Sequence, residues 1–323
     1  MEAIFCENKN KWNKFIFQNS NSFLQSFEWG DFQDKFGRKV FRLMVEENGE
    51  ILVEVQILKY HFLFKNYFYI PYGPIFKNNI IEQSKEANKV LIDKIYELSK
   101  QENCFFLHVE PFSKIDKVGI KSFNSIRRIQ PKKTLVLDLT KSEEELFKSF
   151  SRTTKYNIGL AKRRGVKINR EKEYQNDFYK LMEQTKERQE FGIHSDEYYN
   201  NILKLRGESI KSELFFAEYE DKKINATIML FFGDTATTLH AGSDYNYRQI
   251  KGANLLEWEM ILAVKSEGYK KFDFWGVDDK KWPGLTAFKK GFGGLEIEYP
   301  EGVDIVFQNF WYSAYKIFKS IKK

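Results

Sequence analysis

Residues 214–240 read LFFAEYEDKKINATIMLFFGDTATTLH, and this stretch decides the fold. Leu214–Tyr219 and Ile224–Phe232 are rich in β-branched and aromatic residues and predict two strands of a hairpin, with Asp221-Lys222-Lys223 as the turn. Thr235–His240 predicts a third strand. Farther along, Gly252–Glu267 has apolar residues spaced for one helical face, and Phe272–Trp275 predicts a buried strand. The predicted order is three strands, a helix and a strand.

The same order occurs once earlier in the chain. It comprises strands at Phe41–Val45, Ile51–Leu58 and Tyr67–Tyr72, a helix at Glu86–Lys100 and a strand at Phe105–Val109. Repetition at a distance far above solenoid periods predicts two copies of one α/β domain rather than a repeat array. The length of 323 residues agrees, because single cores stop growing well below it. We place the first domain at residues 1–141, completed by a C-terminal helix at 305–323, and the second at 142–304.

A long helix is predicted where the second domain begins. Ser142 is its N-cap, Glu145 completes a capping box, and Gly165 ends it. One face of this helix carries five basic residues, which are Lys148, Arg152, Lys155, Lys162 and Arg163. Such a face is either simply solvated or contacts the phosphates of a nucleic acid such as tRNA, since basic side chains at helical spacing can follow its backbone.

The C-terminal helix presents a similar choice. Its apolar residues recur at helical spacing and lysines occupy the rest; they are Phe307, Phe310, Trp311, Ala314, Phe318 and Ile321, with Lys316, Lys319, Lys322 and Lys323. The helix either packs against a domain or makes shallow contact with an anionic membrane. No apolar run reaches the roughly 20 residues that span a bilayer, so we expect a cytoplasmic protein, with the inner face of the membrane as a second location.

Composition and motifs restrict the chemistry. A formal charge of +7 favours anionic partners. The sequence has no Gly-x-Ser-x-Gly elbow, no P-loop and no cluster of His or Cys, which excludes the common hydrolase, nucleotidase and metal-site patterns. Cys6 and Cys104 are interpreted as structural thiols. The four histidines are scattered, and any single one is more often structural than catalytic.

One loop, Arg248–Asn254, lies between a predicted strand and the second helix. Its backbone N–H groups and the positive end of the helix dipole suit a pyrophosphate. The loop resembles the one by which Gcn5-related acetyltransferases hold coenzyme A. Gln249 and Gly252 fit that pattern, whereas Asn254 replaces its final small residue. An acetyltransferase ancestry is therefore expected, without dependence on a cofactor.

Several motifs together resemble the FemABX family, the aminoacyltransferases that build peptidoglycan cross-bridges from aminoacyl-tRNA. They are FLQSFEWG at 23–30 with Phe32-Gln33, IPYGP at 70–74, LHAGS at 239–243 with Tyr247-Arg248, FDFWGV at 272–277 and GLTAFKKGFGG at 284–294. The resemblance implies an α/β (α+β) fold of two tandem Gcn5-related acetyltransferase-like domains that face a shared cleft, with the C-terminal helix returning to the first. The helical arm of some members has no room between Tyr198 and Ser212.

The resemblance also implies the chemistry. A free amine of the stem peptide attacks the ester that joins an amino acid to tRNA, which requires alignment and oxyanion stabilisation but no covalent enzyme intermediate. Lys289, next to Phe288, matches the family lysine at the reacting carbonyl; the alternative is an exposed lysine in a glycine-bounded loop. Precursor-binding positions are assigned to Gln33, Lys35, Tyr72, His194, Tyr198, His240, Tyr247 and Arg248. Gln33, His194 and His240 depart from the family's residues, which are basic, Arg and Tyr.

Three functions follow from the sequence. The first is aminoacyl transfer from tRNA, as co-substrate, to a nucleotide-linked or lipid-linked peptidoglycan precursor, by a monomer that needs no cofactor. The second is an acyl-coenzyme A-dependent N-acyltransferase for a small amine or sugar, supported by the Gln249–Gly252 loop. The third is a binding module for nucleic acid or membrane without catalysis, supported by charge and by the two amphipathic helices.

Overall fold

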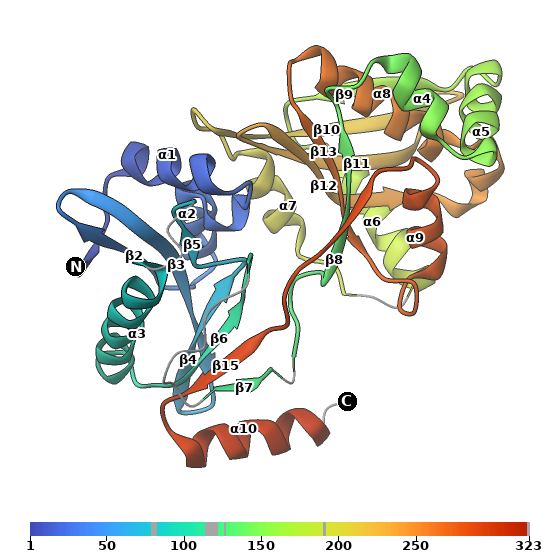
Figure 1. Cartoon of the computed structure of the whole chain (residues 1–323). Helices are drawn as coiled ribbons and strands as arrows, with labels where there is room; N and C mark the ends of the chain where they lie inside the picture. Colours follow the sequence, from blue (N-terminus) through green and yellow to red (C-terminus); the bar gives the residue numbers. More distant parts are fainter. Residues whose placement is uncertain (79–82, 114–121, 126, 190–191, 322–323) are drawn as a thin grey trace. The chain divides into compact units, whose positions relative to one another are not determined.

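The computed structural model describes residues 1–78, 83–113, 122–125, 127–189 and 192–321. The chain divides into two compact units, one made of Met1–Lys132 with Tyr299–Lys323 and the other of Lys133–Glu298. Each unit is built round one mixed sheet (Figure 1).

The sheet of the first unit has the strand order β1-β2-β3-β4-β6-β15-β7, with β5 paired to β3. Its strands are β1 (Glu2–Phe5), β2 (Val40–Glu47), β3 (Glu50–Phe62), β4 (Lys65–Pro71), β5 (Ile75–Phe76), β6 (Cys104–Glu110), β7 (Ser122–Asn124) and β15 (Val303–Val306). Its helices are α1 (Lys9–Asn19), η1 (Phe23–Gln25), α2 (Phe27–Lys35), α3 (Gln83–Gln101) and α10 (Asn309–Ile321). The turn between β2 and β3 has Asn48 and Gly49 at positive φ, as the sequence predicts.

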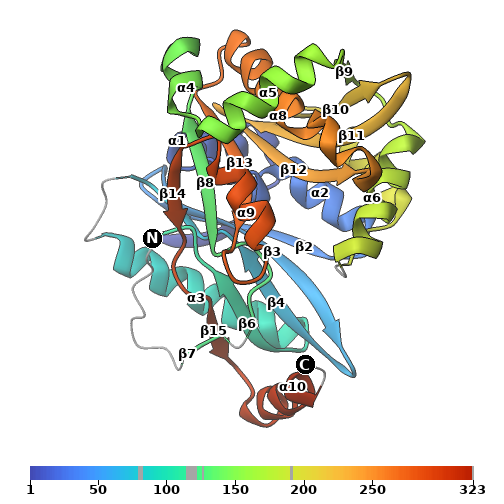
Figure 2. The same cartoon turned by 90° about the vertical axis from the view of Figure 1, so that its right-hand side faces the viewer.

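The sheet of the second unit has the order β14-β8-β13-β12-β11-β10-β9. Its strands are β8 (Lys133–Asp138), β9 (Lys167–Glu171), β10 (Ile210–Tyr219), β11 (Lys222–Phe232), β12 (Thr235–Ser243), β13 (Lys271–Val277) and β14 (Leu295–Glu298). Its helices are α4 (Glu143–Ser149), α5 (Arg152–Arg163), α6 (Asn176–Gln189), α7 (Asp196–Leu203), η2 (Tyr245–Ile250), α8 (Gly252–Ser266) and α9 (Pro283–Lys290). Helices α5 and α8 lie together on one side of this sheet and α6 on the other (Figure 2).

The two units share the predicted order of elements. In each, an antiparallel meander of three strands is followed by a helix and by a strand that pairs in parallel with the third, β6 with β4 and β13 with β12. A helix that crosses the sheet between parallel strands is the connection this pairing requires. The repeat predicted from the sequence is therefore confirmed, and both cysteines are buried free thiols.

The structure differs from the sequence prediction at the domain boundary. Residues 133–138 were assigned to the first domain, but they form β8, which lies between β13 and β14 in the second sheet. The second unit ends at Glu298 rather than at residue 304, because Val303–Val306 form β15 between β6 and β7. The predicted helix at 305–323 is therefore a strand end followed by α10.

The predicted long helix at 142–165 is also wrong in one respect. It is two helices, since Phe150 is extended with ψ 149° and ends α4, and Ser151 begins α5 as its N-cap. The backbone N–H of Ser151 donates instead to the carbonyl of Gly291, 2.8 Å away. The capping box of Ser142 and Glu145 is present as predicted.

Candidate functional site

The parallel strands β12 and β13 separate near their middles. They pair from Thr235 with Lys271 to Thr237 with Asp273. Beyond that point the register of β13 against its other neighbour, β8, shifts between Asp273 and Gly276. Trp275 has a φ of 57°, which a bulky residue rarely adopts. A bulge of this kind redirects the side chains and carbonyls of a strand, and bulges are common beside active sites.

The carboxylate of Asp273 holds the bulge in place. Its Oδ1 atom accepts hydrogen bonds from the backbone N–H of Trp275, at 2.7 Å, and from the hydroxyl of Thr134 on β8. With this hydrogen bond across the bulge, the carbonyls of Trp275 and Gly276 turn toward α9. Both carbonyls accept a hydrogen bond from Lys289.

Lys289 lies in the last turn of α9, so the alternative of an exposed lysine in a loop is wrong. Its Nζ atom lies 2.8 Å from the carbonyl oxygen of Gly276 and 3.4 Å from that of Trp275. Proline at the first helical position begins α9. The lysine side chain is half-buried, and its ammonium is fixed by the bulge rather than by an ion pair.

Two buried carboxyl groups share the electrostatic environment of this lysine. Burial lowers the pKa of Lys289 to about 8, while the charges of Glu257 and Asp273 act to raise it. Burial raises the pKa of Glu257 to about 7 and that of Asp273 to about 6, and attraction by Lys289 opposes both shifts. Near neutral pH the cluster therefore keeps a positive ammonium in a poorly solvated place, where it interacts strongly with developing negative charge.

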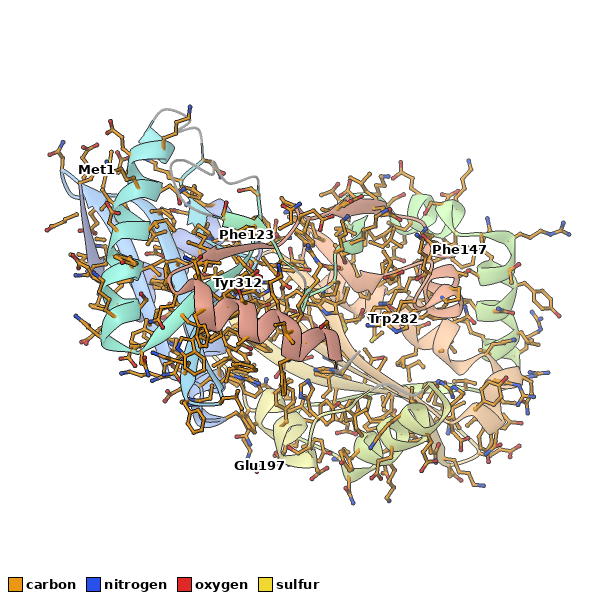
Figure 3. All side chains as sticks on the ribbon, turned by 90° about the horizontal axis from the view of Figure 1, so that it is seen from below. Met1, Phe123, Phe147, Glu197, Trp282 and Tyr312 are labelled. Carbon is orange, nitrogen blue, oxygen red and sulfur yellow. The ribbon has the colours of Figure 1, made fainter. Side chains whose placement is uncertain are left out.

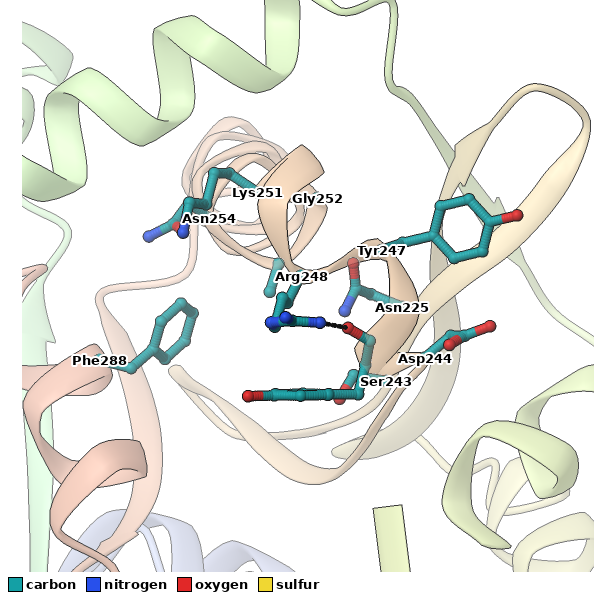
Figure 4. A pocket seen from close by; sticks show the side chains of 11 residues that line it. Asn225, Ser243, Asp244, Tyr247, Arg248, Lys251, Gly252, Asn254 and Phe288 are labelled. Carbon is teal, nitrogen blue, oxygen red and sulfur yellow. Dashed lines mark hydrogen bonds between the residues drawn. The ribbon is translucent and has the colours of Figure 1, made fainter. Parts of the chain in front are cut away.

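A pocket of about 200 Å³ lies at the start of α8 (Figure 4). It is lined by Asn225, Ser243, Asp244, Tyr245, Tyr247, Arg248, Lys251, Gly252, Ala253, Asn254 and Phe288. Lys251, with a φ of 65°, is the N-cap of α8, and its side chain makes no capping hydrogen bond. The helix dipole and backbone N–H groups therefore point toward the pocket, as an anion site requires.

The first position of α8 leaves little room for a side chain. A Cβ atom on Gly252 would lie 2.6 Å from Oδ1 of Asn225 and 2.8 Å from Cδ1 of Ile224. Arg248 lies with its guanidinium 4.3 Å from the ring centroid of Tyr245 and donates to the Tyr245 carbonyl at 3.2 Å. The guanidinium of Arg164 at the end of α5 donates to the carbonyl of Gln249. The loop predicted to suit a pyrophosphate thus forms a pocket wall with cations nearby.

Three predicted site residues, Tyr247, Arg248 and Phe288, meet in this pocket. The ring of Phe288 lies 5.3 Å from that of Phe292, which anchors it to the core of the second unit. The hydroxyl of Tyr247 accepts a hydrogen bond from Lys222 at 3.0 Å. Phe288 and Lys289 are adjacent in α9, but Phe288 lines the pocket whereas the Nζ atom of Lys289 bonds to β13.

A second group of predicted residues surrounds His240 on β12. His194 stacks on Tyr198 at 3.8 Å between ring centroids, and it meets His240 edge to face at 5.7 Å. Tyr199 also contacts His240, at 5.0 Å. Burial lowers the pKa of His240 to about 3. His240 is therefore neutral, and its Nε2 atom is a buried polar atom without a partner among the described residues.

The predicted residues of the first unit have different surroundings. Gln33 is buried in α2 and accepts a hydrogen bond from the guanidinium of Arg38, which lies 4.8 Å from the ring centroid of Tyr60. Lys35 is exposed at the end of α2. Tyr72 is buried, stacks on Tyr299 at 4.2 Å and donates its hydroxyl to the Pro131 carbonyl. Tyr72 therefore supports the fold of the first unit and is not placed to meet a ligand.

The predicted basic face of the helix at 142–165, which we call the basic stripe, is divided between two helices. Arg152, Lys155, Lys162 and Arg163 lie on α5, whereas Lys148 lies on α4, beyond the break at Phe150. The Nζ atom of Lys155 donates to the Lys148 carbonyl at 3.2 Å, and Lys162 pairs with Glu259 at 3.0 Å. The stripe is thus four residues on one helix.

Four residues of the site were not predicted from the sequence, namely Glu257, Asp273, Thr134 and Arg38. Two of them left a signal, because Glu257 interrupts the apolar face of α8 and Asp273 stands between Phe272 and Phe274 in a buried strand. A charged residue among apolar ones is buried only when it has a partner. Thr134 and Arg38 had no such signal. Within the described ranges, no three His, Cys, Asp or Glu side chains gather so as to hold a metal ion, and no helix is long and apolar enough to cross a membrane.

Comparisons with known proteins agree with this architecture. A family model described as the FemAB family matches residues 8–128, 119–220 and 211–320. A lipid II:glycine glycyltransferase of Staphylococcus aureus (strain MRSA252) is 26% identical over 324 residues, which cover 94% of this chain and 72% of the relative. The crystal structure of FemX superposes with a TM-score of 0.83 at 20% identity, over 97% of this chain and 99% of FemX. A tandem GNAT protein from the clavulanic acid pathway gives 0.55 at 11% identity, over 83% of each chain.

Proposed function

Since the chain belongs to the FemAB family, we propose that it is an aminoacyltransferase which moves an amino acid from aminoacyl-tRNA to the stem-peptide amine of a peptidoglycan precursor. The observation that carries this proposal is the half-buried ammonium of Lys289, which is fixed on two carbonyls of the β13 bulge. Its neighbour Phe288 lines the pocket at the start of α8. The relatives named lipid II:glycine glycyltransferase support a precursor that is linked to lipid.

The reaction needs few groups from the protein. The amine nitrogen attacks the ester carbonyl, a C–N bond forms, the C–O bond to the tRNA ribose breaks, and one proton passes from the amine to the departing hydroxyl. Negative charge develops on the carbonyl oxygen during the attack. In this proposal Lys289 stabilises that oxygen, and its immobile setting avoids reorganisation at the moment of reaction. Phe288, the preceding residue, lines the pocket at the start of α8.

The pocket at the start of α8 is suited to a phosphate of the tRNA acceptor end. Arg248, Lys251 and the N–H groups of α8 supply the positive potential. The α5 stripe would extend this contact to more distant phosphates, because Arg152, Lys162 and Arg163 are exposed. For the precursor, Tyr198, His194 and His240 offer stacking faces and one unpartnered ring nitrogen on the second unit. In the first unit, Arg38 offers a cation next to Gln33, and Lys35 a second one nearby.

The location follows from the substrate in this proposal. A lipid-linked precursor presents its stem peptide at a bilayer surface, and charged tRNA is cytoplasmic. We therefore propose that the enzyme works at the inner face of the membrane, without an added cofactor.

The experiment that tests the function is a transfer assay with purified protein, charged tRNAs and both forms of precursor. Mass spectrometry should find the stem peptide heavier by one amino acid residue. Ribonuclease treatment of the charged tRNA before mixing should abolish the product. Absence of product with every charged tRNA and both precursors would refute the proposal.

The alternative is an acyl-coenzyme A-dependent N-acyltransferase, which the same α8 pocket and the Gln249–Gly252 loop favour. Coenzyme A would place its pyrophosphate where we place a tRNA phosphate. Titration calorimetry separates the two, since coenzyme A should bind at micromolar concentration under the alternative and should fail to bind under our proposal.

A further inference from the structure

The first unit exposes a group of large apolar side chains round its C-terminal helix. Leu63 and Phe64 form the turn between β3 and β4 and are 66% and 85% exposed, and Phe310 and Ile317 on α10 are 77% and 62% exposed. Phe123 and Tyr96 beside α10 are also exposed. We call Leu63, Phe64, Phe310 and Ile317 the apolar patch. A contiguous group of large apolar side chains is unfavourable in water and usually marks a surface that binds a partner or a membrane.

The turn and the helix form one surface. The ring of Phe62, at the end of β3, lies 5.0 Å from Tyr315 and 5.3 Å from Phe318 on α10. The ammonium of Lys65, at the start of β4, lies 5.8 Å from the Trp311 ring centroid. The turn that carries the patch is thus packed against the helix that completes it.

Helix α10 is apolar on more than its packed side. Tyr312 and Tyr315 are buried against the β sheet, and Tyr312 also stacks on Phe123 (Figure 3). Phe310 and Ile317 are two turns apart and therefore lie on one face, about 160° round the helix from Tyr312. The packing of α10 on the first unit consequently uses one side and leaves a second apolar side in solvent. The two uses weighed from the sequence, packing and membrane contact, belong to different faces.

The turn between β3 and β4 has a residue that is unfavourable at its position. Leu63 has a φ of 52°, and a two-residue hairpin turn with positive φ normally contains Asn or Gly. Leucine at such a position is strained, and strain of this kind is concentrated at functional sites. Packing does not account for the choice, because Leu63 and Phe64 extend away from the core.

Lysines occur on both elements that carry the patch, but of those described only Lys65 lies beside it. Lys65 lies beside the turn, and Lys316 and Lys319 lie on α10 next to the buried tyrosines. The sequences of α10 and of residues 59–67 contain no Asp or Glu. Protruding aliphatic and aromatic side chains with Lys65 beside them and no acidic residue in the turn or in α10 match the interfacial region of an anionic bilayer, where apolar groups enter the acyl boundary and cations meet headgroups.

We propose that the apolar patch docks the enzyme on an anionic membrane, with Leu63 and Phe64 inserted and Lys65 at the headgroups. This proposal rests on the proposed function in one respect, since a lipid-linked precursor is reached at a membrane. A groove for a protein partner would be concave, whereas this patch is the tip of a hairpin and a convex helix face.

The test is co-sedimentation of the full chain with vesicles of phosphatidylcholine, with and without phosphatidylglycerol. The protein should bind the anionic vesicles and be released by high salt. The double variant Phe64→Ser, Phe310→Ser should bind about a hundredfold more weakly, because each side chain contributes about tenfold on burial. The control is Leu295→Ser, which removes a side chain that is 70% exposed in the second unit and should bind like the unaltered protein.

Activity assays separate this proposal from the proposed function. The double variant should lose transfer to a precursor embedded in vesicles and keep transfer to a soluble nucleotide-linked precursor, which shows that it is folded. Equal vesicle binding by the double variant and the unaltered protein would overturn the docking proposal, as would no binding by either. A dimer that the double variant converts to a monomer in light scattering would assign the patch to self-association instead. Vesicle binding by the unaltered protein without transfer to either precursor would refute the function and leave docking standing.

Discussion

Lys289 and Lys290 are neighbours at the end of α9 with opposite environments. Lys289 is half-buried and bonds to the carbonyls of Trp275 and Gly276, whereas Lys290 is exposed and pairs with Asp279 at 2.8 Å. We expect Lys289→Ala to lower kcat by about two or more orders of magnitude, the scale for loss of one oxyanion stabiliser. Lys290→Ala should keep nearly full activity, because exposed ion pairs contribute little. Steady-state kinetics with thermal unfolding as a folding check would measure both. Normal turnover by Lys289→Ala would remove the lysine from the mechanism.

The alkaline side of the pH profile reports the charge of Lys289. Burial lowers its pKa to about 8, so the ammonium predominates below that pH and the neutral amine above it. Because the charged form stabilises the oxyanion, we expect kcat to fall as pH rises through about 8. The attacking amine must itself lose a proton, which would make the rate rise with pH, so a falling limb is diagnostic. The residual activity of Lys289→Ala should lack this limb; a limb at the same pH in that variant would contradict the assignment.

The site residues that belong to local motifs could be predicted from the sequence. Those whose role depends on contacts with distant parts of the chain could not. Phe288 and Lys289 were found because they stand in a recognisable run between glycines. Asp273 was missed because its role depends on Thr134, which comes from β8 at the far end of the second unit's sequence. Tyr72 was assigned to substrate on its motif alone, and its stacking on Tyr299 could not be read from a local pattern.

At the scale of elements, local patterns predicted the order of the strands and helices. They did not predict where the helix at 142–165 is interrupted. The hairpins and the α3 and α8 helices follow from alternation and helical periodicity. The break between α4 and α5 coincides with a hydrogen bond from Ser151 to Gly291, which lies far along the sequence, and with a local N-cap at Ser151 that was overlooked. The same break removes Lys148 from the basic stripe.

The α5 stripe makes a prediction about tRNA. Reversing two exposed charges, Arg152→Glu with Arg163→Glu, should raise the KM for aminoacyl-tRNA several-fold and reduce its salt dependence, since phosphate contacts release counterions. The KM for the precursor should not change. The matched control reverses two exposed lysines on α6, Lys180→Glu with Lys186→Glu, which lie on the other side of the sheet. If both double variants behave alike, the stripe is a solvated surface.

The contact between α6 and β12 depends on a glycine. A Cβ atom on Gly242 would lie 2.8 Å from the backbone carbon of Leu181 and 2.9 Å from the nitrogen of Met182, so the α6 backbone would have to move. We expect Gly242→Ala to lower the free energy of unfolding by about 1–3 kcal/mol, as overpacking does. The control is Gly284→Ala in α9, where the new Cβ atom meets open space. Alanine should be neutral or stabilise by up to about 1 kcal/mol there. Urea denaturation would measure both, and equal stability of the two variants would contradict the expectation.

At the scale of the whole molecule, the shared cleft implied by the family resemblance stays a prediction. The structure shows how the chain is divided between the two units. The second unit is one continuous segment inserted into the first. The two places where the chain leaves and returns are adjacent, because the N–H of Tyr299 donates to the carbonyl of Lys132 at 2.8 Å and Glu298 pairs with Lys133 in the sheet. The boundary was predicted too late along the chain, although Pro131, two residues before β8, is a local signal for a break.

This arrangement predicts which pieces of the chain fold. Residues 133–298 carry their own core, so they should unfold cooperatively as an isolated fragment. Residues 1–132 alone should not, because β15 is missing from its place beside β6, and the aromatic cluster round Tyr67 and Phe106 loses Tyr312 and Tyr315. Joining residue 132 to residue 299 through a short glycine linker should restore folding of the first unit, since those residues are hydrogen-bonded neighbours. Circular dichroism melting of the three proteins would measure this. A cooperative transition in residues 1–132 by themselves would show that β15 and α10 are dispensable to the first unit, and its absence in the linked protein would show that the first unit depends on the second.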